Sequence, residues 1–378
     1  MSTYLDYNAS TPIDERVLNV MFDVYRNTYG NADNMNHVFG ENASQAVDKA
    51  RLCVADLLGI KKDEVFFTSG ATESDNMVIF GLRDYAEKTG KKHIITTSIE
   101  HKAVLEPINH LENMGFEISY ISPDETGRIN SEEVINSIRD DTLLVSVMHA
   151  NNETGIIQPI KEIGEALAST DVFFHIDAAQ TFGKLVDELR EVKYTFLSAS
   201  AHKMYGPQGI GVLVMRKKRY KLPPLTPMFY GGSQEHGFRP GTVPTALIAG
   251  FGEACKIACD EYSYNLKKYK ETKDSIFKIL ISSGVQYSIN GSQEYCIPNT
   301  LNIRFIGVNS TALMQQCKPF CGVSNGSACN SSSHTPSHVL KAMGYSDEHA
   351  EQSIRISWGI DSDLNDFQRL VEIAKMWA

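Results

Sequence analysis

The fold is decided by the stretch Ser198-Ala199-Ser200-Ala201-His202-Lys203-Met204-Tyr205-Gly206-Pro207, which follows the apolar run of residues 194–197. Gly206 and Pro207 predict a turn, and residues 209–215 have the pattern of the next buried strand. Lys203 is therefore expected in a tight connection between two strands. Burial there penalises the ammonium form and leaves the amine as a nucleophile. Taken by itself, the motif would also fit a surface lysine.

Two alternative interpretations of this region are set aside on spacing and charge. The glycines at 206, 209 and 211 precede a strand and do not link a strand to a helix, which argues against a dinucleotide site. The 378 residues contain 46 acidic and 36 basic side chains, for a net charge of −10. Direct nucleic-acid binding is therefore not expected as a main activity.

Composition places the chain among soluble globular proteins. Its 42% hydrophobic and 22% charged residues are ordinary values, and its length can bury a large core. No apolar run reaches the length of a membrane helix, and the first residues do not resemble a signal peptide, so a cytoplasmic protein without a membrane partner is expected. Seven cysteines are an odd number, which favours reduced thiols, and their spacings complete no metal site.

Strands and helices alternate on the N-terminal side of Lys203. Strands are expected over residues 64–68, 93–97, 143–148 and 172–176, each followed by a polar cluster. This alternation predicts an α/β fold with a mostly parallel sheet covered by helices on both faces. Such sheets bind ligands just beyond the carboxyl ends of their strands. The polar clusters are therefore expected at one edge of the sheet.

Two domains are expected from the change in composition after residue 258. A helix from Pro244 to Cys259 is followed by a charged, lysine-rich helical stretch, Glu261 to Lys278. We place a large cofactor-binding domain at residues 14–258, and a smaller α+β domain at residues 1–13 and 259–378. In the large domain, Asp14 is expected to cap a helix with one apolar face, formed by Val17, Leu18, Met21, Phe22 and Tyr25.

The polar residues at the strand ends form a chemical set. The turn after residue 68 opens a helix, and its unpaired amides and the helix dipole favour an anion. The set as a whole comprises Gly70, Ala71, Thr72, His101, Asn152, Asp177, Gln180, Ser200, His202 and Lys203. It suits pyridoxal 5'-phosphate, which needs a lysine, a carboxylate on its ring nitrogen and donors for its phosphate. Asp177 would keep the ring nitrogen protonated.

Six motifs make the chain resemble a group I cysteine desulfurase. They are Thr-Ser-Gly-Ala-Thr-Glu-Ser-Asp-Asn, Glu-His-Lys-Ala-Val, Asn-Asn-Glu-Thr-Gly, His-Ile-Asp-Ala-Ala-Gln, His-Lys-Met-Tyr-Gly-Pro and Gly-Ser-Ala-Cys. The match runs from Tyr4 to about Trp358. The resemblance implies a homodimer in the class V aminotransferase family, with the large domain and smaller α+β domain of pyridoxal-phosphate fold type I.

The resemblance also implies a role for each matched residue. Lys203 would carry the cofactor, His101 would stack on its ring, and Asp177 would pair with its nitrogen. Gln180 and Asn152 would meet the ring oxygen or the substrate. The phosphate would be held by residues of the cradle and by one residue of the other subunit: Ala71, Thr72, Ser200, His202 and, from the other subunit, Thr242.

Two further residues would complete the chemistry. Arg355 lies between apolar residues of a strand and matches the family's substrate-carboxylate arginine, for which a bidentate guanidinium is suited. Cys329 lies in a loop rich in glycine and serine, an unusual place for a packing cysteine. We expect it to be a nucleophile on a mobile arm.

The expected reaction converts L-cysteine to L-alanine. Freed Lys203 would remove the Cα proton, His101 would act on the substrate thiol, and the Cys329 thiolate would attack the substrate sulfur. The resulting persulfide would pass to an acceptor protein.

Other functions are also compatible with the sequence. The chain stops sooner after its last helix than relatives that serve Fe–S scaffolds, which favours a sulfur donor for DNA phosphorothioation over Fe–S cluster assembly or tRNA thiolation. The remaining alternatives are a selenocysteine lyase, an ordinary aminotransferase and a non-catalytic scaffold on the same fold.

Overall fold

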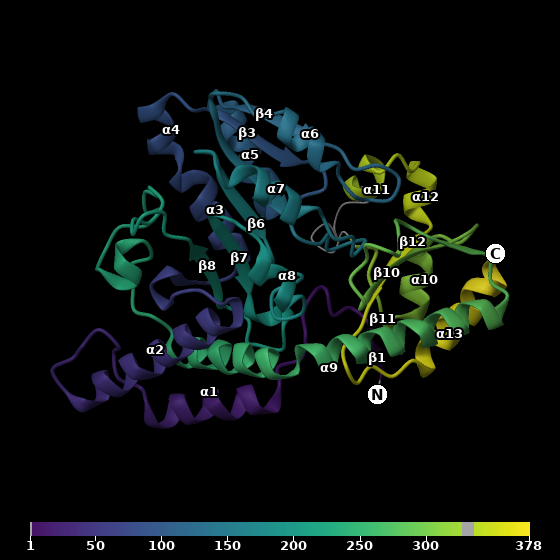
Figure 1. The fold of residues 1–378 in the computed structure, drawn as a ribbon. Helices are drawn as coiled ribbons and strands as arrows, with labels where there is room; N and C mark the ends of the chain where they lie inside the picture. The colour runs from purple at the N-terminus through teal and green to yellow at the C-terminus, as the bar shows by residue number, and fades with distance from the viewer. Residues whose placement is uncertain (1, 327–335) are drawn as a thin grey trace.

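The computed structural model describes residues 2–326 and 336–378. Two lobes are joined by one long helix, α9 (Thr245–Ser283), which runs beneath both of them (Figure 1). The larger lobe contains a seven-stranded sheet, and the smaller lobe contains a three-stranded sheet near both chain termini.

The large sheet has the strand order β2-β8-β7-β6-β5-β3-β4. Its strands are β2 (Val65–Thr68), β3 (His93–Thr97), β4 (Glu117–Ile121), β5 (Thr142–Met148), β6 (Phe173–Asp177), β7 (Phe196–Ser200) and β8 (Gly211–Met215). Strands β4, β3, β5, β6 and β7 pair in parallel, whereas β8 is antiparallel to both β7 and β2. This mostly parallel sheet confirms the expected fold class.

The reversal of β8 follows from the short connection that precedes it. A parallel neighbour requires a crossover of a dozen or more residues, usually a helix. Residues 201–210 provide only a short 3-10 turn, η2 (Ala201–Lys203), and a loop. The chain therefore returns antiparallel, and Lys203 lies in a strand-to-strand connection as predicted.

Helices cover both faces of this sheet, because neighbouring strand residues point to opposite sides. Phe66 packs into the cluster that includes Val78 of α3 and Val104 of α5, whereas Val65 and Phe67 pack into the larger cluster on the other face. The helices of this lobe are α1 (Glu15–Asn27), α2 (Val38–Leu58), α3 (Ala71–Gly81), α4 (Arg83–Thr89), α5 (Lys102–Asn113), α6 (Ser131–Asn136), α7 (Ile160–Leu167) and α8 (Val186–Glu191).

The N-terminal cap of helix α1 is as predicted, but its buried face differs from the prediction. Asp14 caps it by accepting a hydrogen bond from the Arg16 amide, as expected. Phe22 and Tyr25, expected on the buried face, are 67% and 61% exposed. The buried residues are Val17, Met21 and Val24, because the contact with α9 covers a narrower stripe than the apolar pattern offers.

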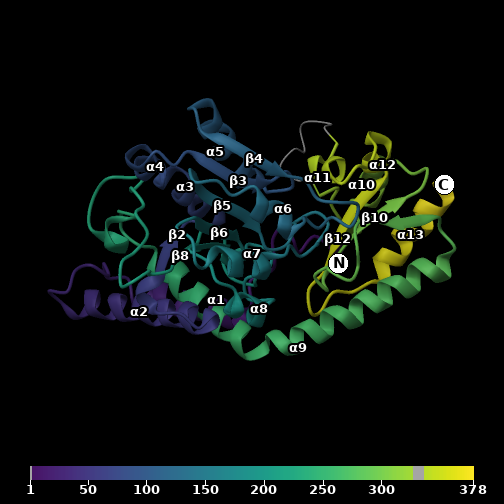
Figure 2. The same cartoon turned by 45° about the horizontal axis from the view of Figure 1, so that its top comes forward.

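The small lobe is built from segments at both ends of the chain (Figure 2). Its sheet has the order β12-β10-β9, and a parallel pair joins β1 to β11. The elements are β1 (Thr3–Tyr4), β9 (Tyr287–Ile289), β10 (Thr300–Phe305), β11 (Cys321–Gly322), β12 (Ser353–Ser357), α10 (Ser310–Cys317), α11 (His338–Ala342), α12 (Asp347–Glu351) and α13 (Asn365–Trp377). Leu5 is buried in the core of this lobe.

The sequence suggested two helical stretches around residue 259, and the structure has one. Helix α9 continues without a break through the change in composition. The cores nevertheless separate along it, because Ala258 packs into the large-lobe cluster and Tyr269 into the small-lobe cluster. This distribution supports the division at 14–258, which stays a prediction. Among the described residues, no helix is both long and apolar enough to cross a membrane.

Candidate active site

Lys203 lies where the N-terminal segment crosses the carboxyl edge of the large sheet. Its Nζ donates to the main-chain oxygens of Asn8 and Ala9, the second at 2.9 Å. Thr11 continues the contact by donating its hydroxyl to the carbonyl of His202 at 3.0 Å. We call residues 6–11 the N-terminal strap. It brings a segment from the small lobe onto the lysine of the large lobe.

The turn between β2 and α3 forms an anion cradle. Gly70 precedes α3 and makes no side-chain cap, and the Ala71 amide donates to Ser200 Oγ at 2.7 Å. A side chain at Gly211 would come within 2.5 Å of the Gly70 backbone, so only glycine allows β8 to pack against this turn. Thr72 is exposed beside it and lines an open cleft of about 460 Å³. The helix N-terminus is thus available for a phosphate.

His202 and His101 flank the lysine in neutral form. Burial, together with the charges of Lys203 and Lys184, lowers the pKa of His202 to about 4. His101 caps α5, because its Nδ1 accepts from the Ala103 amide at 3.1 Å. Burial also lowers the pKa of His101, while Asp177 raises it and Lys203 lowers it. The ring is therefore within electrostatic range of both groups that would hold the cofactor.

Asp177 ends β6 as a buried carboxylate. Its Oδ1 accepts from the Ala179 amide at 2.9 Å. Burial, with a smaller contribution from the nearby carboxyl of Asp75, raises the pKa of Asp177 to about 6. At neutral pH this group is an anion in a dry site, which is the state that a protonated ring nitrogen requires.

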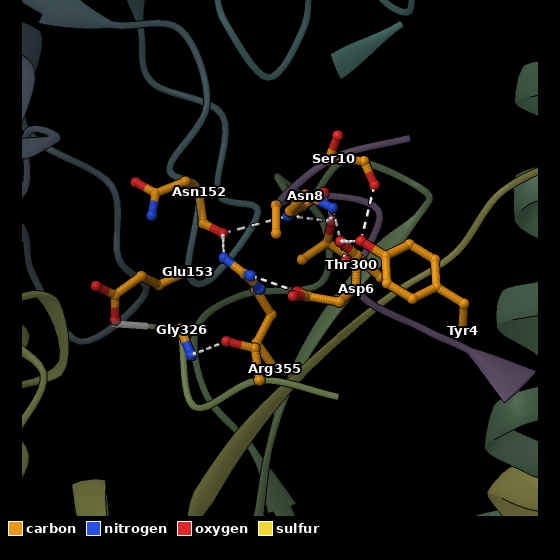
Figure 3. Close-up of polar contacts among 12 residues, drawn as sticks. Tyr4, Asp6, Asn8, Ser10, Asn152, Glu153, Thr300, Gly326 and Arg355 are labelled. Atoms are coloured by element: carbon orange, nitrogen blue, oxygen red, sulfur yellow. Dashed lines mark hydrogen bonds and ion pairs between the residues drawn. The ribbon is translucent and has the colours of Figure 1, made fainter. Parts of the chain in front are cut away.

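Gln180 and Asn152 meet the N-terminal strap. Gln180 Nε2 donates to the Asn8 oxygen at 3.0 Å, and its Oε1 has no hydrogen-bond partner among the described residues. The Asn8 side chain donates to the Asn152 oxygen at 3.2 Å and to Thr300 Oγ1 at 2.9 Å (Figure 3). Asn152 thus contacts the strap through its main chain.

Arg355 reaches the same place from the small lobe. On β12 its Nη1 donates to the Asn152 oxygen at 2.8 Å, and its Nη2 pairs with Asp6 Oδ1 at 2.5 Å (Figure 3). The strap therefore joins the two sides of the site, because Asn8 and Ala9 hold the amine of Lys203 and Asp6 holds the guanidinium.

Two predicted residues are not brought to this cluster by the described chain. Cys329 lies outside the described residues. Thr242 is exposed in the loop before α9 and makes no hydrogen bond to the other candidates within residues 2–326 and 336–378. Its expected role on the other subunit's phosphate stays a prediction.

Sequence reasoning missed a buried acid–base pair beneath the site. Asp75 on α3 lies 3.3 Å from Nε2 of His175 on β6, and both side chains are fully buried. Burial raises the pKa of Asp75 to about 7 and lowers that of His175 to about 4. The period of two along β6 could have indicated this pair, because it places His175 on the same face as Asp177.

The arrangement fits pyridoxal 5'-phosphate. The N-terminus of α3 at Gly70 is open to a phosphate, and the side-chain oxygen Oε1 of Gln180 has no hydrogen-bond partner among the described residues. The buried carboxylate of Asp177 accepts a hydrogen bond from the Ala179 amide. Lys203 would hold the aldehyde carbon, Asp177 the ring nitrogen, and Ser200, Thr72 and the amides of α3 the phosphate.

Comparison with known proteins gives the same result over nearly the whole chain. The family described as Aminotransferase class-V matches residues 3–370. The cysteine desulfurase IscS of Neisseria meningitidis serogroup C is 44% identical over 373 residues, which make up 98% of this chain and 91% of that enzyme. A solved NifS-like protein is 35% identical with a TM-score of 0.90, covering 100% of this chain and 99% of its own. SspA, solved in complex with cysteine, is 37% identical with a TM-score of 0.82, covering 96% and 100%. The resemblance drawn from the motifs is confirmed, and the chain belongs to the class-V aminotransferase family, among relatives that include cysteine desulfurases.

Proposed function

We propose that this chain is a pyridoxal-phosphate-dependent cysteine desulfurase that converts L-cysteine to L-alanine and transfers the sulfur to a protein acceptor. The observation that carries the proposal is the meeting of Lys203, Asp177 and the open terminus of α3 at one sheet edge, with Arg355 facing them across the N-terminal strap. The similarity to enzymes named cysteine desulfurase, and to a protein solved with cysteine, supports the substrate.

Three side chains of this protein have separate roles in binding and activating the substrate. The bound cofactor would supply an electron sink for a carbanion at Cα. Lys203, released from the carbonyls of Asn8 and Ala9, takes the Cα proton. Arg355 fixes the carboxylate, and His101, neutral because burial lowers its pKa, accepts the proton of the substrate thiol.

The sulfur step uses Cys329 as the thiolate. Its sulfur attacks the substrate sulfur, so an S–S bond forms while the Cβ–S bond breaks. The electron pair of the broken bond stays on the substrate carbon, which gains a proton and leaves as L-alanine. The persulfide then carries the sulfur to the acceptor, and no external oxidant or reductant is required.

Mass spectrometry tests this assignment directly. After incubation with L-cysteine, we expect one additional sulfur, about 32 Da, on the peptide that contains Cys329, and an equal yield of L-alanine. The variant Cys329→Ala should bind the cofactor normally and form almost no alanine. Full activity of this variant toward L-cysteine would instead favour an ordinary aminotransferase. Faster turnover of selenocysteine than of cysteine would favour a selenocysteine lyase.

A homodimer is part of the proposal. Exposed apolar side chains gather at the ends of α1 and α2, where the rings of Tyr29 and Phe39 stack at 5.6 Å. The patch consists of Phe22, Tyr25, Tyr29, Val38 and Phe39. Exposed apolar side chains grouped on neighbouring helix ends are typical of a subunit interface. A second copy seated there would also allow Thr242 to reach the partner's phosphate.

We also propose which cellular pathway receives the sulfur. Sulfur donation to DNA phosphorothioation is the pathway proposed, with Fe–S assembly and tRNA thiolation as alternatives. Feeding cells L-cysteine labelled with ³⁵S, with and without the gene, distinguishes them. Gene-dependent label in DNA supports phosphorothioation, whereas label confined to tRNA or to Fe–S proteins contradicts it.

A further inference from the structure

The arginine proposed for the substrate carboxylate already has a carboxylate partner in the protein. Nη2 of Arg355 pairs with Asp6 Oδ1 at 2.5 Å, and its side chain is 3% exposed against 18% for Asp6. Nη1 donates to the main-chain oxygen of Asn152 at 2.8 Å. Figure 3 shows the guanidinium between these two groups. Its Nε is buried and has no hydrogen-bond partner among the described residues.

This pairing leaves a defined part of the guanidinium for a ligand. A guanidinium carries five N–H donors in one plane and can bind a carboxylate through two of them. Asp6 and Asn152 engage the two terminal nitrogens, and Nε remains a buried donor without a described partner. Nε is therefore the nitrogen of Arg355 that no described protein group engages, and Asp6 lies at the Nη2 end of the guanidinium.

The backbone holds Asp6 beside Arg355. The flanking residues are tied to β12, because Ser357 donates its amide to Leu5 at 2.9 Å and accepts from Tyr7 at 3.3 Å. The main-chain oxygen of Asp6 accepts a hydrogen bond from the Ala9 amide at 2.9 Å. Asp6 can change its rotamer, but its main chain cannot leave the site without breaking these bonds.

We propose that Asp6 is a positioning residue that limits how tightly Arg355 holds a carboxylate. Asp6 neutralises a buried guanidinium, which would otherwise be costly to bury. When a substrate or product carboxylate arrives, the same negative charge opposes it. Because L-cysteine and L-alanine carry the same carboxylate, this weakening acts equally on both and favours product release. The proposal rests on the role proposed above for Arg355.

The test compares L-alanine binding to the wild-type holoenzyme and to Asp6→Asn. Asparagine keeps a hydrogen-bond acceptor for Nη2 and removes the charge. We expect calorimetry to show L-alanine binding about 10-fold tighter in Asp6→Asn, because one opposing charge has been removed from a charge-assisted contact. The KM for L-cysteine should fall by a similar factor without a gain in kcat. Unchanged or weaker L-alanine binding would overturn the proposal.

A double-mutant cycle assigns the effect to the pair. Arg355→Gln should bind L-alanine at least 10-fold more weakly, and adding Asp6→Asn to it should change nothing further. If Asp6→Asn tightens L-alanine binding equally in the wild type and in Arg355→Gln, the effect does not act through Arg355 and the proposal is wrong. Asp14→Asn is the matched control, because it removes the carboxylate of a different ion pair, the one with Arg16. It should leave L-alanine binding unaltered.

These readouts separate the inference from the proposed function. L-alanine binding needs neither Cys329 nor turnover, so an enzyme that fails to desulfurate L-cysteine still reports on Asp6 and Arg355. Conversely, a normal persulfide yield with unchanged L-alanine affinity in Asp6→Asn would sustain the desulfurase and reject this role of Asp6.

Discussion

Asp177 has two further carboxyl groups buried behind it, on Asp75 and Glu100. Burial raises the pKa of Asp75 to about 7 and that of Glu100 to about 8, compared with about 6 for Asp177. Neighbouring buried carboxylates resist sharing negative charge, so the group with the lowest pKa ionises first. Asp177 is that group, and it accepts a backbone hydrogen bond from Ala179 that favours its anion. The cluster therefore concentrates its charge where the ring nitrogen of the cofactor would lie.

The stability of the apoprotein should reveal the neutral state of Asp75. Its pKa is higher folded than unfolded, so its contribution is fully present below about pH 4 and is lost as pH rises through about 7. Asp75→Asn mimics the neutral acid at every pH. Relative to wild type, we expect the variant to gain on the order of 2–3 kcal/mol in unfolding free energy between pH 5 and pH 8. Urea denaturation at several pH values measures this difference.

An exposed carboxylate provides the control for this measurement. Asp48 pairs with Lys62 at 3.2 Å on the surface, where both side chains are more than half exposed. Asp48→Asn should show a difference from wild type that is nearly independent of pH. If Asp75→Asn behaves in the same way, Asp75 is not held neutral by burial.

At the residue scale, the sequence revealed the groups that follow strands and missed those that act through long-range pairing. Lys203, Ser200 and Asp177 could be found because each lies at the end of an apolar run. Asp6 and Asn8 could not, because Asp6 meets a residue 349 positions away and Asn8 acts partly through its main-chain oxygen. No local pattern marks an interaction of either kind.

Helices α2 and α9 are closely packed at Gly252. A methyl group there would lie 2.5 Å from the Cα of Ala50, so the two backbones touch at this point. Two turns of α9 around it pack on the large lobe, and the same helix continues to the core of the small lobe. The contact between α2 and α9 therefore helps set the orientation of the small lobe relative to the large lobe.

Gly252→Ala and Gly250→Ala should differ sharply in stability. Alanine favours a helix over glycine by about 1 kcal/mol at either position. At 252 the added methyl meets backbone, and we expect a net loss of about 1–3 kcal/mol from overpacking. At 250 it meets Cγ of the Met21 side chain at 2.6 Å, which can shift more easily than backbone, so the loss should be smaller than at 252. Thermal unfolding of the two variants gives the comparison, and equal Tm values would contradict a backbone contact at 252.

At the element scale, the positions of most strands of the large sheet followed from the sequence, and helix continuity did not. Apolar runs located β2, β3, β5, β6 and β7, because strands that are buried on both faces have little alternation. The division of α9 into two stretches was wrong because composition reports which face is solvated, and a helix can leave one core and enter another without a break. Such a change of surroundings does not interrupt the backbone hydrogen bonds.

At the scale of the whole molecule, the candidate site depends on contact between the lobes. Lys203 belongs to the large sheet and Arg355 to the small one, and the N-terminal strap bonds to both. The patch on α1 and α2 lies at the opposite end of α9 from the C-terminus (Figure 1). A second subunit bound there would approach the large lobe and leave the far end of the small lobe uncovered.

Breaking that interface should cost both dimerisation and cofactor affinity. Phe22→Asp replaces an exposed aromatic side chain of the patch by a charge. Each dimer would lose two buried rings worth about 1.5–3 kcal/mol apiece, so we expect the dissociation constant to rise at least about 100-fold. Analytical ultracentrifugation should show a monomer, and cofactor affinity should fall because Thr242 no longer reaches the partner's phosphate. Ile281→Asp, at the far end of α9 and also exposed, should remain a dimer with normal affinity. A Phe22→Asp dimer, or a monomer that binds the cofactor as tightly as wild type, would remove the reason to place Thr242 in the other subunit's site.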